Sequence, residues 1–170
     1  TDLSRRELGY KDVRHQKDVS DPDYSAFLAA QLERFLDENG VDRGKLLGVG
    51  VSLAGVISAE SRAILFAPTL ALRDVPFSQL LQAIPYPTRL ENDGTCGGFA
   101  EWFSSPGTRN IAFLSIEDGV GGSVLVNGAQ FTGDNGRSGE FGHMCVEPGG
   151  LPCKCGRRGC LEAYCSATRL

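Results

Sequence analysis

Residues 139–143 read Gly-Glu-Phe-Gly-His, and residues 153–162 read Cys-Lys-Cys-Gly-Arg-Arg-Gly-Cys-Leu-Glu. Zinc favours four nitrogen and sulfur ligands in a tetrahedron. The stretch supplies such a set: His143, Cys153, Cys155 and Cys160. A filled tetrahedron leaves no position for an activated water, so we expect a structural metal. Segment 143–160 is therefore predicted to be a zinc-binding loop that holds the neighbouring carboxylates in place.

Two other interpretations of these cysteines stay open. Six cysteines allow three disulfides in an oxidising compartment, although Cys153 and Cys155 are too close to bridge each other easily. A glycine-rich loop with inert thiols is the second. The spacing departs from common zinc fingers but satisfies the ligand chemistry, which favours zinc. Cys145 is a possible substitute ligand, and Cys96 and Cys165 are expected to be ordinary small core residues.

The same stretch closely resembles the signature of the ROK family, which groups sugar kinases with sugar-responsive repressors. That signature reads roughly Gly-Glu-x-Gly-His, a spacer, then Cys-x-Cys-Gly-x-x-Gly-Cys-Leu-Glu, and every fixed position is present here. The resemblance extends upstream through residues 90–93 and the glycine turn at 119–122. Among ROK proteins, the chain is most similar in type to repressors that respond to N-acetylglucosamine or xylose.

The resemblance implies an actin-like ATPase (ribonuclease H-like) fold, in which two α/β lobes with mixed sheets and flanking helices border a cleft. We expect residues 1–100 to form an N-terminal lobe that lacks its first strand. Residues 101–170 would begin the C-terminal lobe and carry the zinc loop. The family's Asp-x-Gly-Gly-Thr phosphate loop would fall just before Thr1, so we expect a fragment of a longer protein.

Composition predicts a globular chain. Apolar residues make up 41% of its 170 residues, which is enough for a core. No apolar run approaches the ~20 residues of a membrane helix, and we expect a cytoplasmic protein. The net charge of −4 comes without a basic stripe, which argues against this segment gripping DNA by itself. Contact with DNA would come from a segment outside the chain.

In the first half, charged and apolar residues alternate over about residues 1–15, which predicts a strand hairpin. Asp21-Pro22 then offers a helix start, followed by apolar residues at three- and four-residue spacing until Gly40. This pattern predicts an amphipathic helix packed on a sheet. Residues 46–56 read as a buried strand. The small-residue turn at 52–55 ends it, where ligands tend to bind in open α/β sheets.

In the second half we expect a short helix at 77–84, a strand at 88–91, a helix starting at 98–103 and a strand at 111–116. Residues 123–131 read as a hairpin that turns at Asn127-Gly128. The resulting order is strand, helix, strand, helix, strand, hairpin and zinc loop. That order matches the fold implied by the resemblance.

Asn92-Asp93 follows a strand and precedes a glycine. A carboxylate there can accept a proton from a sugar hydroxyl, and the amide can hydrogen-bond neighbouring hydroxyls. A surface turn is the plainer interpretation of Asn-Asp-Gly, but the strand and the resemblance favour a site. In ROK kinases the matching Asp is the general base, so Asp93 takes that role only in a kinase. The resemblance implies five sugar-binding residues: Asn92, Asp93, Glu140, His143 and Glu162.

The phosphate-handling turn departs from the family pattern. ROK kinases have Gly-Thr-Gly at a place where this chain has Glu117-Asp118-Gly119, followed by Gly121 and Gly122. Phosphate loops point backbone N–H groups at oxyanions, and nearby carboxylates repel phosphate. Gly119, Gly121 and Gly122 thus form a phosphate-loop-like turn with a weakened nucleotide site.

We therefore expect the sugar-sensing domain of a ROK transcriptional regulator, in which lobes close around a monosaccharide or amino sugar and control an upstream DNA-binding segment. The alternative is a ROK hexose or N-acetylhexosamine kinase with ATP and Mg²⁺ as cofactors. A zinc-stabilised structural module without a small ligand would leave Asn92-Asp93 unexplained. Family analogy predicts a homodimer.

Overall fold

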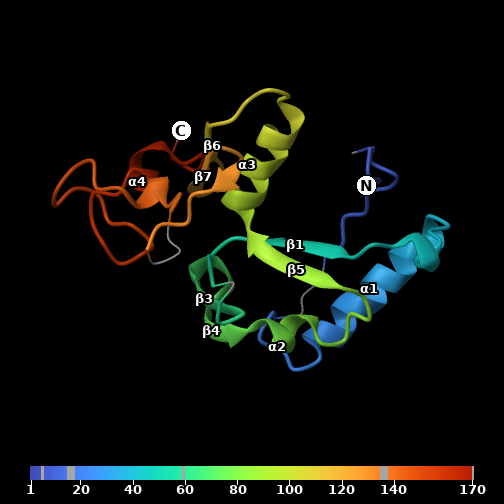
Figure 1. Cartoon of the computed structure of the whole chain (residues 1–170). Coiled ribbons are helices and arrows are strands. Elements are labelled where there is room, and N and C mark those ends of the chain that lie inside the picture. The colour runs from blue at the N-terminus through green and yellow to red at the C-terminus, as the bar shows by residue number, and fades with distance from the viewer. Residues whose placement is uncertain (5, 15–17, 59, 135–137, 170) are drawn as a thin grey trace.

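The computed structural model describes residues 1–4, 6–14, 18–58, 60–134 and 138–169. Within these residues the strands form three sheets, with the orders β1-β5, β2-β3-β4 and β6-β7-β8 (Figure 1). The first pair is parallel and the other two sheets are antiparallel. Helix α3 contacts strands of both the first and the third sheet. The architecture is therefore α/β with mixed strand directions.

Strands β1 (Val49–Leu53) and β5 (Thr88–Asn92) form the parallel pair. Their register places Leu53 opposite Asn92, so both strands end at the same edge of the sheet. The turn that follows β1 and the first residue of α3 lie at this edge. Such an edge is where ligands bind in open α/β sheets.

An antiparallel meander and a short helix connect β1 to β5. The four elements are β2 (Val56–Ser58), β3 (Ala63–Ala67), β4 (Leu72–Pro76) and α2 (Phe77–Leu81). They supply most of a buried apolar cluster, to which β5 adds one residue: Ile64, Ala67, Leu72, Phe77, Leu80 and Leu90. This core joins the meander and α2 to the parallel pair.

Helix α1 (Tyr24–Glu38) follows the predicted amphipathic pattern. Leu36 is buried, and Tyr24 packs against the apolar core. The helix contacts α2, and the backbone N–H of Ala83 donates to Ser25 Oγ at 2.9 Å. Gly40 follows the helix with a φ of 61°, a left-handed conformation that suits glycine and ends the helix.

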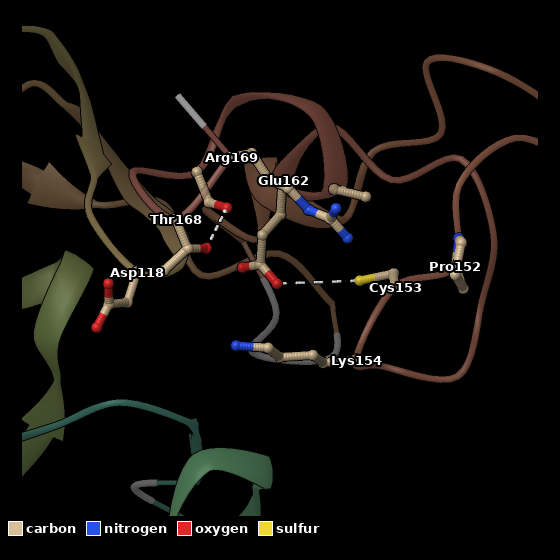
Figure 2. Close-up of a pocket in the computed structure, with 9 residues that line it drawn as sticks. Asp118, Pro152, Cys153, Lys154, Glu162, Thr168 and Arg169 are labelled. Carbon is tan, nitrogen blue, oxygen red and sulfur yellow. Dashed lines mark hydrogen bonds between the residues drawn. The ribbon is translucent and has the colours of Figure 1, made fainter.

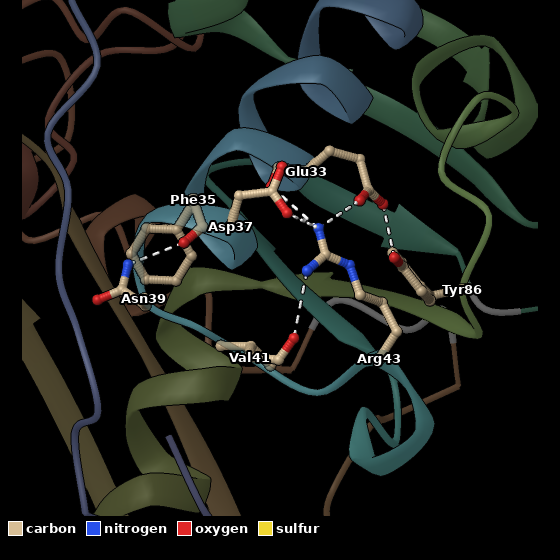
Figure 3. Close-up of polar contacts among 7 residues, drawn as sticks. All are labelled: Glu33, Phe35, Asp37, Asn39, Val41, Arg43 and Tyr86. Atoms are coloured by element: carbon tan, nitrogen blue, oxygen red, sulfur yellow. Dashed lines mark hydrogen bonds and ion pairs between the residues drawn. The ribbon is translucent and has the colours of Figure 1, made fainter.

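A polar network attaches the C-terminal half of α1 to the segments that lead into β1 and β5 (Figure 3). Arg43 donates to Glu33 Oε2 at 3.0 Å and to Asp37 Oδ1 at 2.5 Å. The Tyr86 hydroxyl donates to Glu33 Oε1 at 2.6 Å. This hydrogen bond from Tyr86, together with Arg43, lowers the pKa of Glu33. The same hydrogen bond raises the pKa of Tyr86, because it favours the protonated phenol.

Helix α3 packs closely against the third sheet. Its bounds and those of the three strands are α3 (Asp93–Ser104), β6 (Ile111–Ile116), β7 (Val120–Val126) and β8 (Ala129–Gln130). A Cβ atom at Gly98 would overlap Ser123 Oγ, and one at Gly97 would lie 2.6 Å from the Phe113 ring. Glycine at these helix positions therefore allows a close approach that a larger residue would prevent.

The predicted hairpin at Asn127-Gly128 is present between β7 and β8. Both turn residues have positive φ values, 53° and 79°. A two-residue turn with both central φ values positive is type I′, which matches the twist of antiparallel strands. Asn-Gly is the sequence that this turn favours most, and it explains why the hairpin could be predicted.

The C-terminal segment contains only short regular elements among its described residues. They are η3 (Phe141–His143) and α4 (Glu162–Cys165). The chain between them is held by isolated pairings, Cys145 with Cys160 and Pro152 with Arg158. Figure 1 shows this segment beside the β6–β7 sheet.

The predicted N-terminal hairpin is wrong where the structure describes it. Residues 1–4 and 6–14 contain no strand, and the end of the prediction at residue 15 lies outside the described residues. Asp2 Oδ1 accepts hydrogen bonds from the backbone N–H groups of Ser4 and Arg6, both at 2.9 Å. A side chain that satisfies its own backbone in this way competes with strand pairing.

Several predicted bounds also change. Asp21-Pro22 lies in the turn before α1 rather than in its first turn, the first strand is shorter than 46–56, and the short helix ends at Leu81. Helix α3 begins at Asp93, five residues before the predicted 98. None of the three strands β2, β3 and β4 was predicted as a separate element. None of the described helices is long and apolar enough to cross a membrane.

Candidate metal centre and ligand site

Residues 153–156 form a tight turn that brings two cysteines to one place. The N–H of Cys153 donates to the carbonyl of Arg157 at 2.9 Å, and the N–H of Gly156 donates to the carbonyl of Cys153 at 3.0 Å. Gly156 has a φ of 89°, which other residues rarely adopt. The turn therefore depends on a glycine at position 156, directly after Cys155 and before Arg157.

The other two ligands come from segments that pair with each other. His143 ends η3, and Cys160 lies two residues before α4. The N–H of Leu161 donates to the carbonyl of Met144 at 2.9 Å, and the N–H of Val146 donates to the carbonyl of Gly159 at 2.8 Å. These backbone bonds hold the His143 side chain next to the cysteine turn.

The four predicted ligands form one cluster, with their ligand atoms all within 4.8 Å of one another. Cys155 Sγ lies 3.7 Å from Cys160 Sγ, and Cys153 Sγ lies 3.7 Å from His143 Nδ1. A tetrahedral zinc with Zn–S bonds of about 2.3 Å separates its sulfur ligands by about 3.8 Å. All six cysteines are free, so no disulfide competes for these sulfurs. The cluster fits a tetrahedral metal ion, and Cys145 lies outside it.

The three clustered thiols differ in acidity. Burial, reinforced by hydrogen bonds with the neighbouring thiols, raises the pKa of Cys160 to about 12. Burial also raises the pKa of Cys153. Burial opposes ionisation of Cys155 too, but hydrogen bonds from the backbone and side chain of Arg157, and from the other thiols, lower its pKa to about 7. Because a metal ion binds thiolates, a divalent cation would favour the charged form of all three.

Gly122 of β7 is in close contact with two glycines that adjoin candidate residues in sequence. A Cβ atom at Gly94 would lie 2.6 Å from the backbone nitrogen of Gly122, and one at Gly139 would overlap the Gly122 carbonyl. Asp93 and Glu140 each adjoin one of these glycines in sequence. The close backbone contacts therefore bring the backbone beside Asp93 and beside Glu140 to the same residue of β7.

Glu162 connects the cysteine cluster to the same strand. Its Oε2 accepts a hydrogen bond from the N–H of Val120 at 3.0 Å, and its Oε1 lies 3.9 Å from Cys153 Sγ. The same Cys153 sulfur faces His143 Nδ1, while His143 Nε2 lies 3.9 Å from Glu140 Oε2. One ring nitrogen thus faces the sulfurs and the other faces a carboxylate.

Asn92 and Asp93 join β5 directly to α3. Asn92 Oδ1 accepts from the N–H of Thr95 at 3.0 Å and caps the helix, while its Nδ2 donates to the carbonyl of Gly55 at 2.9 Å. Asp93 Oδ1 accepts from the N–H of Gly94 at 2.8 Å, and its side chain is exposed to solvent. The Asn92 amide is therefore used structurally, and the Asp93 carboxylate is held in position at an open surface.

The predicted phosphate-loop-like turn is in part strand: Gly119 precedes β7, whereas Gly121 and Gly122 lie in β7, paired with Ser115 and Leu114 of β6. The stretch is also partly closed to anions. The N–H of Glu117 donates to the carbonyl of Gly119 at 2.8 Å, and the Glu117 and Asp118 residues are exposed. The N–H of Val120 already binds the Glu162 carboxylate. A Cβ atom at Gly122 would lie 2.7 Å from the Phe141 ring, whereas Gly121 has open space around it.

A small pocket of about 50 Å³ opens beside the cysteine cluster. Figure 2 shows Glu162 and Lys154 on the side of Cys153, with Asp118 and Thr168 facing them. The volume admits a few waters or one polar substituent rather than a whole sugar ring. Two basic residues that line this pocket, Lys154 and Arg169, were not predicted as site residues. Lys154 could have been noticed, because it stands between two of the predicted cysteine ligands.

The sequence matches the model of the ROK family over residues 7–170. The chain belongs to the ROK family. The glucokinase of Halalkalibacterium halodurans is 33% identical to this ROK chain over 145 residues, which cover 83% of the chain and 44% of the relative. The xylose repressor of Bacillus subtilis is 30% identical over 160 residues, covering 92% of the chain and 41% of the relative. The ROK chain thus spans less than half the length of both.

The solved structures give the same result for the fold. A ROK family glucokinase from Streptomyces griseus, in complex with glucose and AMPPNP, matches with a TM-score of 0.73 and 27% identity. The match covers 88% of this ROK chain and 48% of that chain. The predicted ROK membership and actin-like ATPase fold are confirmed. Curated relatives include both glucokinases and xylose repressors.

Proposed function

We propose that the chain is the sugar-binding, effector-sensing part of a ROK-family transcriptional regulator. Residues 1–100 and 101–170 belong to two lobes that close on a monosaccharide or amino sugar. Closure controls DNA binding by a segment upstream of this chain, in a cytoplasmic homodimer. The xylose repressor relative, 30% identical over 92% of the chain, supports a regulator.

One observation carries the choice of a regulator over a kinase. The N–H of Val120, the first residue of β7, binds the Glu162 carboxylate at 3.0 Å, and Glu117 and Asp118 lie just before Gly119 in the sequence. A phosphate a few ångströms from a carboxylate is repelled by about 1–4 kcal/mol per charge pair. Three carboxylates in this region therefore disfavour nucleotide phosphates.

In the proposed site, the sugar hydroxyls meet Asn92, Asp93, Glu140, His143 and Glu162. The carboxylates accept hydrogen bonds from hydroxyls, and His143 presents to the ligand its Nε2, which lies 3.9 Å from Glu140 Oε2. A carboxylate side chain that is already held in one conformation loses less conformational entropy when a ligand binds. Glu162 is such a side chain, because the Val120 N–H donates a hydrogen bond to it. The ligand shifts the lobe equilibrium only if it binds the closed arrangement more tightly.

Zinc is the proposed ion in the cluster of His143, Cys153, Cys155 and Cys160. A zinc ion there would be structural and would fix the orientation of the His143 ring, since Nδ1 faces the sulfurs. The adjoining residues would then keep Glu140 and Glu162 on either side of the ring. The zinc ion would thus hold side chains in position and take no part in a reaction.

A ROK sugar kinase is the second candidate, supported by the position of Asp93. Its carboxylate is anchored by the Gly94 N–H and exposed at the end of β5, where a general base would meet a sugar hydroxyl. The glucokinase relative, 33% identical over 83% of the chain, agrees with this function. ATP and Mg²⁺ would then be required.

The deciding experiment uses the protein encoded by the complete gene. Sugars are screened by calorimetry, and each is tested in a coupled assay for ATP-dependent phosphorylation. We expect at least one monosaccharide to bind and to change operator affinity, with no turnover. Turnover that Asp93→Asn abolishes would establish the kinase and refute the regulator. The same substitution at Asp74, in strand β4 of the meander, serves as the control (Asp74→Asn) and should leave sugar binding and turnover unchanged.

A further inference from the structure

Cys145 stands directly opposite a predicted metal ligand. Cys145 and Cys160 are partners in an isolated antiparallel pairing. The flanking bonds run from the N–H of Leu161 to the carbonyl of Met144 and from the N–H of Val146 to the carbonyl of Gly159. In this pattern the central residues exchange no hydrogen bond with each other, so they form the non-hydrogen-bonded type of pair.

That type of pair has a geometry that suits a disulfide. Its Cα atoms lie about 4.5 Å apart and its side chains project on the same face. Disulfides form over Cα separations of about 4.4–6.8 Å. A rotation of the two side chains, with a small backbone adjustment, would therefore bring the sulfurs into bonding contact.

The two thiols differ in access to reagents. Cys145 is exposed, whereas Cys160 is 1% exposed and its sulfur lies 3.7 Å from that of Cys155. A small oxidant in solution therefore reaches Cys145 before it reaches Cys160. The metal cluster excludes Cys145, which leaves that thiol available.

We propose that Cys145 and Cys160 form a redox-modification site through which a low-molecular-weight disulfide releases the metal. The inference rests on the proposed zinc cluster. The Cys145 thiolate attacks the disulfide RSSR, forms a mixed disulfide and expels RS⁻. The Cys160 sulfur then leaves the metal, attacks the Cys145 sulfur and expels the second RS⁻. Two cysteine thiols are oxidised and one RSSR is reduced to two thiols.

Loss of Cys160 from the cluster changes the metal site and its surroundings. Three ligands remain, His143, Cys153 and Cys155, whereas a structural zinc site uses four. Zinc therefore binds more weakly after oxidation. Cys160 is two residues from Glu162, which binds the Val120 N–H, so oxidation also disturbs the proposed sugar site.

The test treats zinc-loaded chain with excess oxidised glutathione in the presence of a chromogenic zinc chelator. Zinc content is measured first, and disulfides are mapped afterwards by mass spectrometry of peptides. We expect zinc release together with a Cys145–Cys160 linkage, and recovery of zinc binding after a thiol reductant and zinc are added. The Cys145→Ser variant should release zinc more slowly by on the order of tenfold.

Matched controls separate the proposal from a folding defect. Cys145→Ala provides a second variant, circular dichroism checks the fold of both, and Cys165→Ser should release zinc at the wild-type rate. Equal release from wild type and both Cys145 variants, or a Cys155–Cys160 linkage in place of Cys145–Cys160, would overturn the proposal. Protein without zinc before oxidation would refute the metal cluster and the release step, and the peptide map would still decide the pairing.

Discussion

At the residue scale, Cys160 is the most buried of the four clustered ligands, with 1% of its surface exposed. Cys160→Ser keeps the size but replaces the thiolate that a zinc ion needs. We expect zinc to fall from about one per chain to below about 0.2. The thermal midpoint should fall by on the order of 10 °C, because metal binding stabilises the folded state. Elemental analysis and calorimetry measure both.

Cys145→Ser is the control for this change, because Cys145 is exposed and lies outside the cluster. It should retain the full zinc content under reducing conditions. Wild-type protein that folds without any bound zinc would contradict the metal assignment itself.

Glu162 offers the second test at this scale. Glu162→Gln preserves an oxygen for the Val120 N–H but removes the negative charge. A hydrogen bond to a charged group contributes about 1.5–3 kcal/mol, so sugar binding should weaken about 10- to 100-fold. Calorimetric titration with the sugar identified for the complete protein gives the affinity. Glu101→Gln, at an exposed position of α3, should bind as wild type, and an unchanged affinity in Glu162→Gln would remove Glu162 from the site.

At the scale of elements, α3 depends on its glycines. Alanine is normally the better helix former by about 1 kcal/mol. In Gly98→Ala, however, the new Cβ would overlap Ser123 Oγ and lie 3.3 Å from Phe113 Cβ. Overpacking of this kind costs about 1–3 kcal/mol in the free energy of unfolding. Urea unfolding monitored by circular dichroism measures the difference.

The partner substitution shows whether this overlap is the cause. Ser123→Ala alone should be close to neutral, because the buried Ser123 hydroxyl has no hydrogen-bond partner within the described part of the chain. Combined with Gly98→Ala it should recover much of the lost stability, since the overlapping oxygen is gone. Additive effects of the two changes would contradict the close packing.

The elements that could be predicted are those with strong local signals. The spacing of apolar residues predicts α1, the apolar runs predict β1 and β6, and Asn127-Gly128 predicts the turn of the hairpin. The first residues of α3 could not be predicted, because three glycines lower its local helix propensity and packing against β6 and β7 outweighs it.

The meander could not be recognised for a different reason. Strand β2 has only three residues, and β4 carries Arg73 and Asp74 in its centre. The apolar run of β3 was the available signal. In the candidate site, the cysteine spacing predicted which ligands come together. The Val120 N–H that holds Glu162 is a backbone group brought near by folding, so no sequence pattern marks it.

At the scale of the whole molecule, the network of Glu33, Arg43 and Tyr86 predicts a pH dependence of stability. The Tyr86 hydrogen bond and Arg43 lower the pKa of Glu33 in the folded state. On acidification, Glu33 is therefore protonated at a higher pH in the unfolded chain than in the folded one. This contribution is present above the ordinary glutamate pKa of about 4.3 and is lost as the pH falls through the lowered value. Tyr86 has a raised pKa, so its contribution is lost at the alkaline end.

Glu33→Gln should therefore reduce the loss of stability on acidification below about pH 4.3. Urea unfolding at a series of pH values measures this slope. Glu101→Gln, which changes the charge equally on exposed α3, serves as the reference. A Glu33→Gln curve parallel to that of wild type through the acid range would show that the network does not link α1 to the fold energetically.

The junction at Asn92–Asp93 has a mechanical consequence. Strand β5 ends at Asn92 and α3 begins at the next residue, so no loop absorbs motion between them. The helix contacts β1 and β5 of the first sheet as well as β6 and β7 of the third, and the contact with β7 already begins at Gly94. If the third sheet rotated relative to the first, α3 would therefore move as well. Because Asp93 is the first residue of α3, its carboxylate would change orientation.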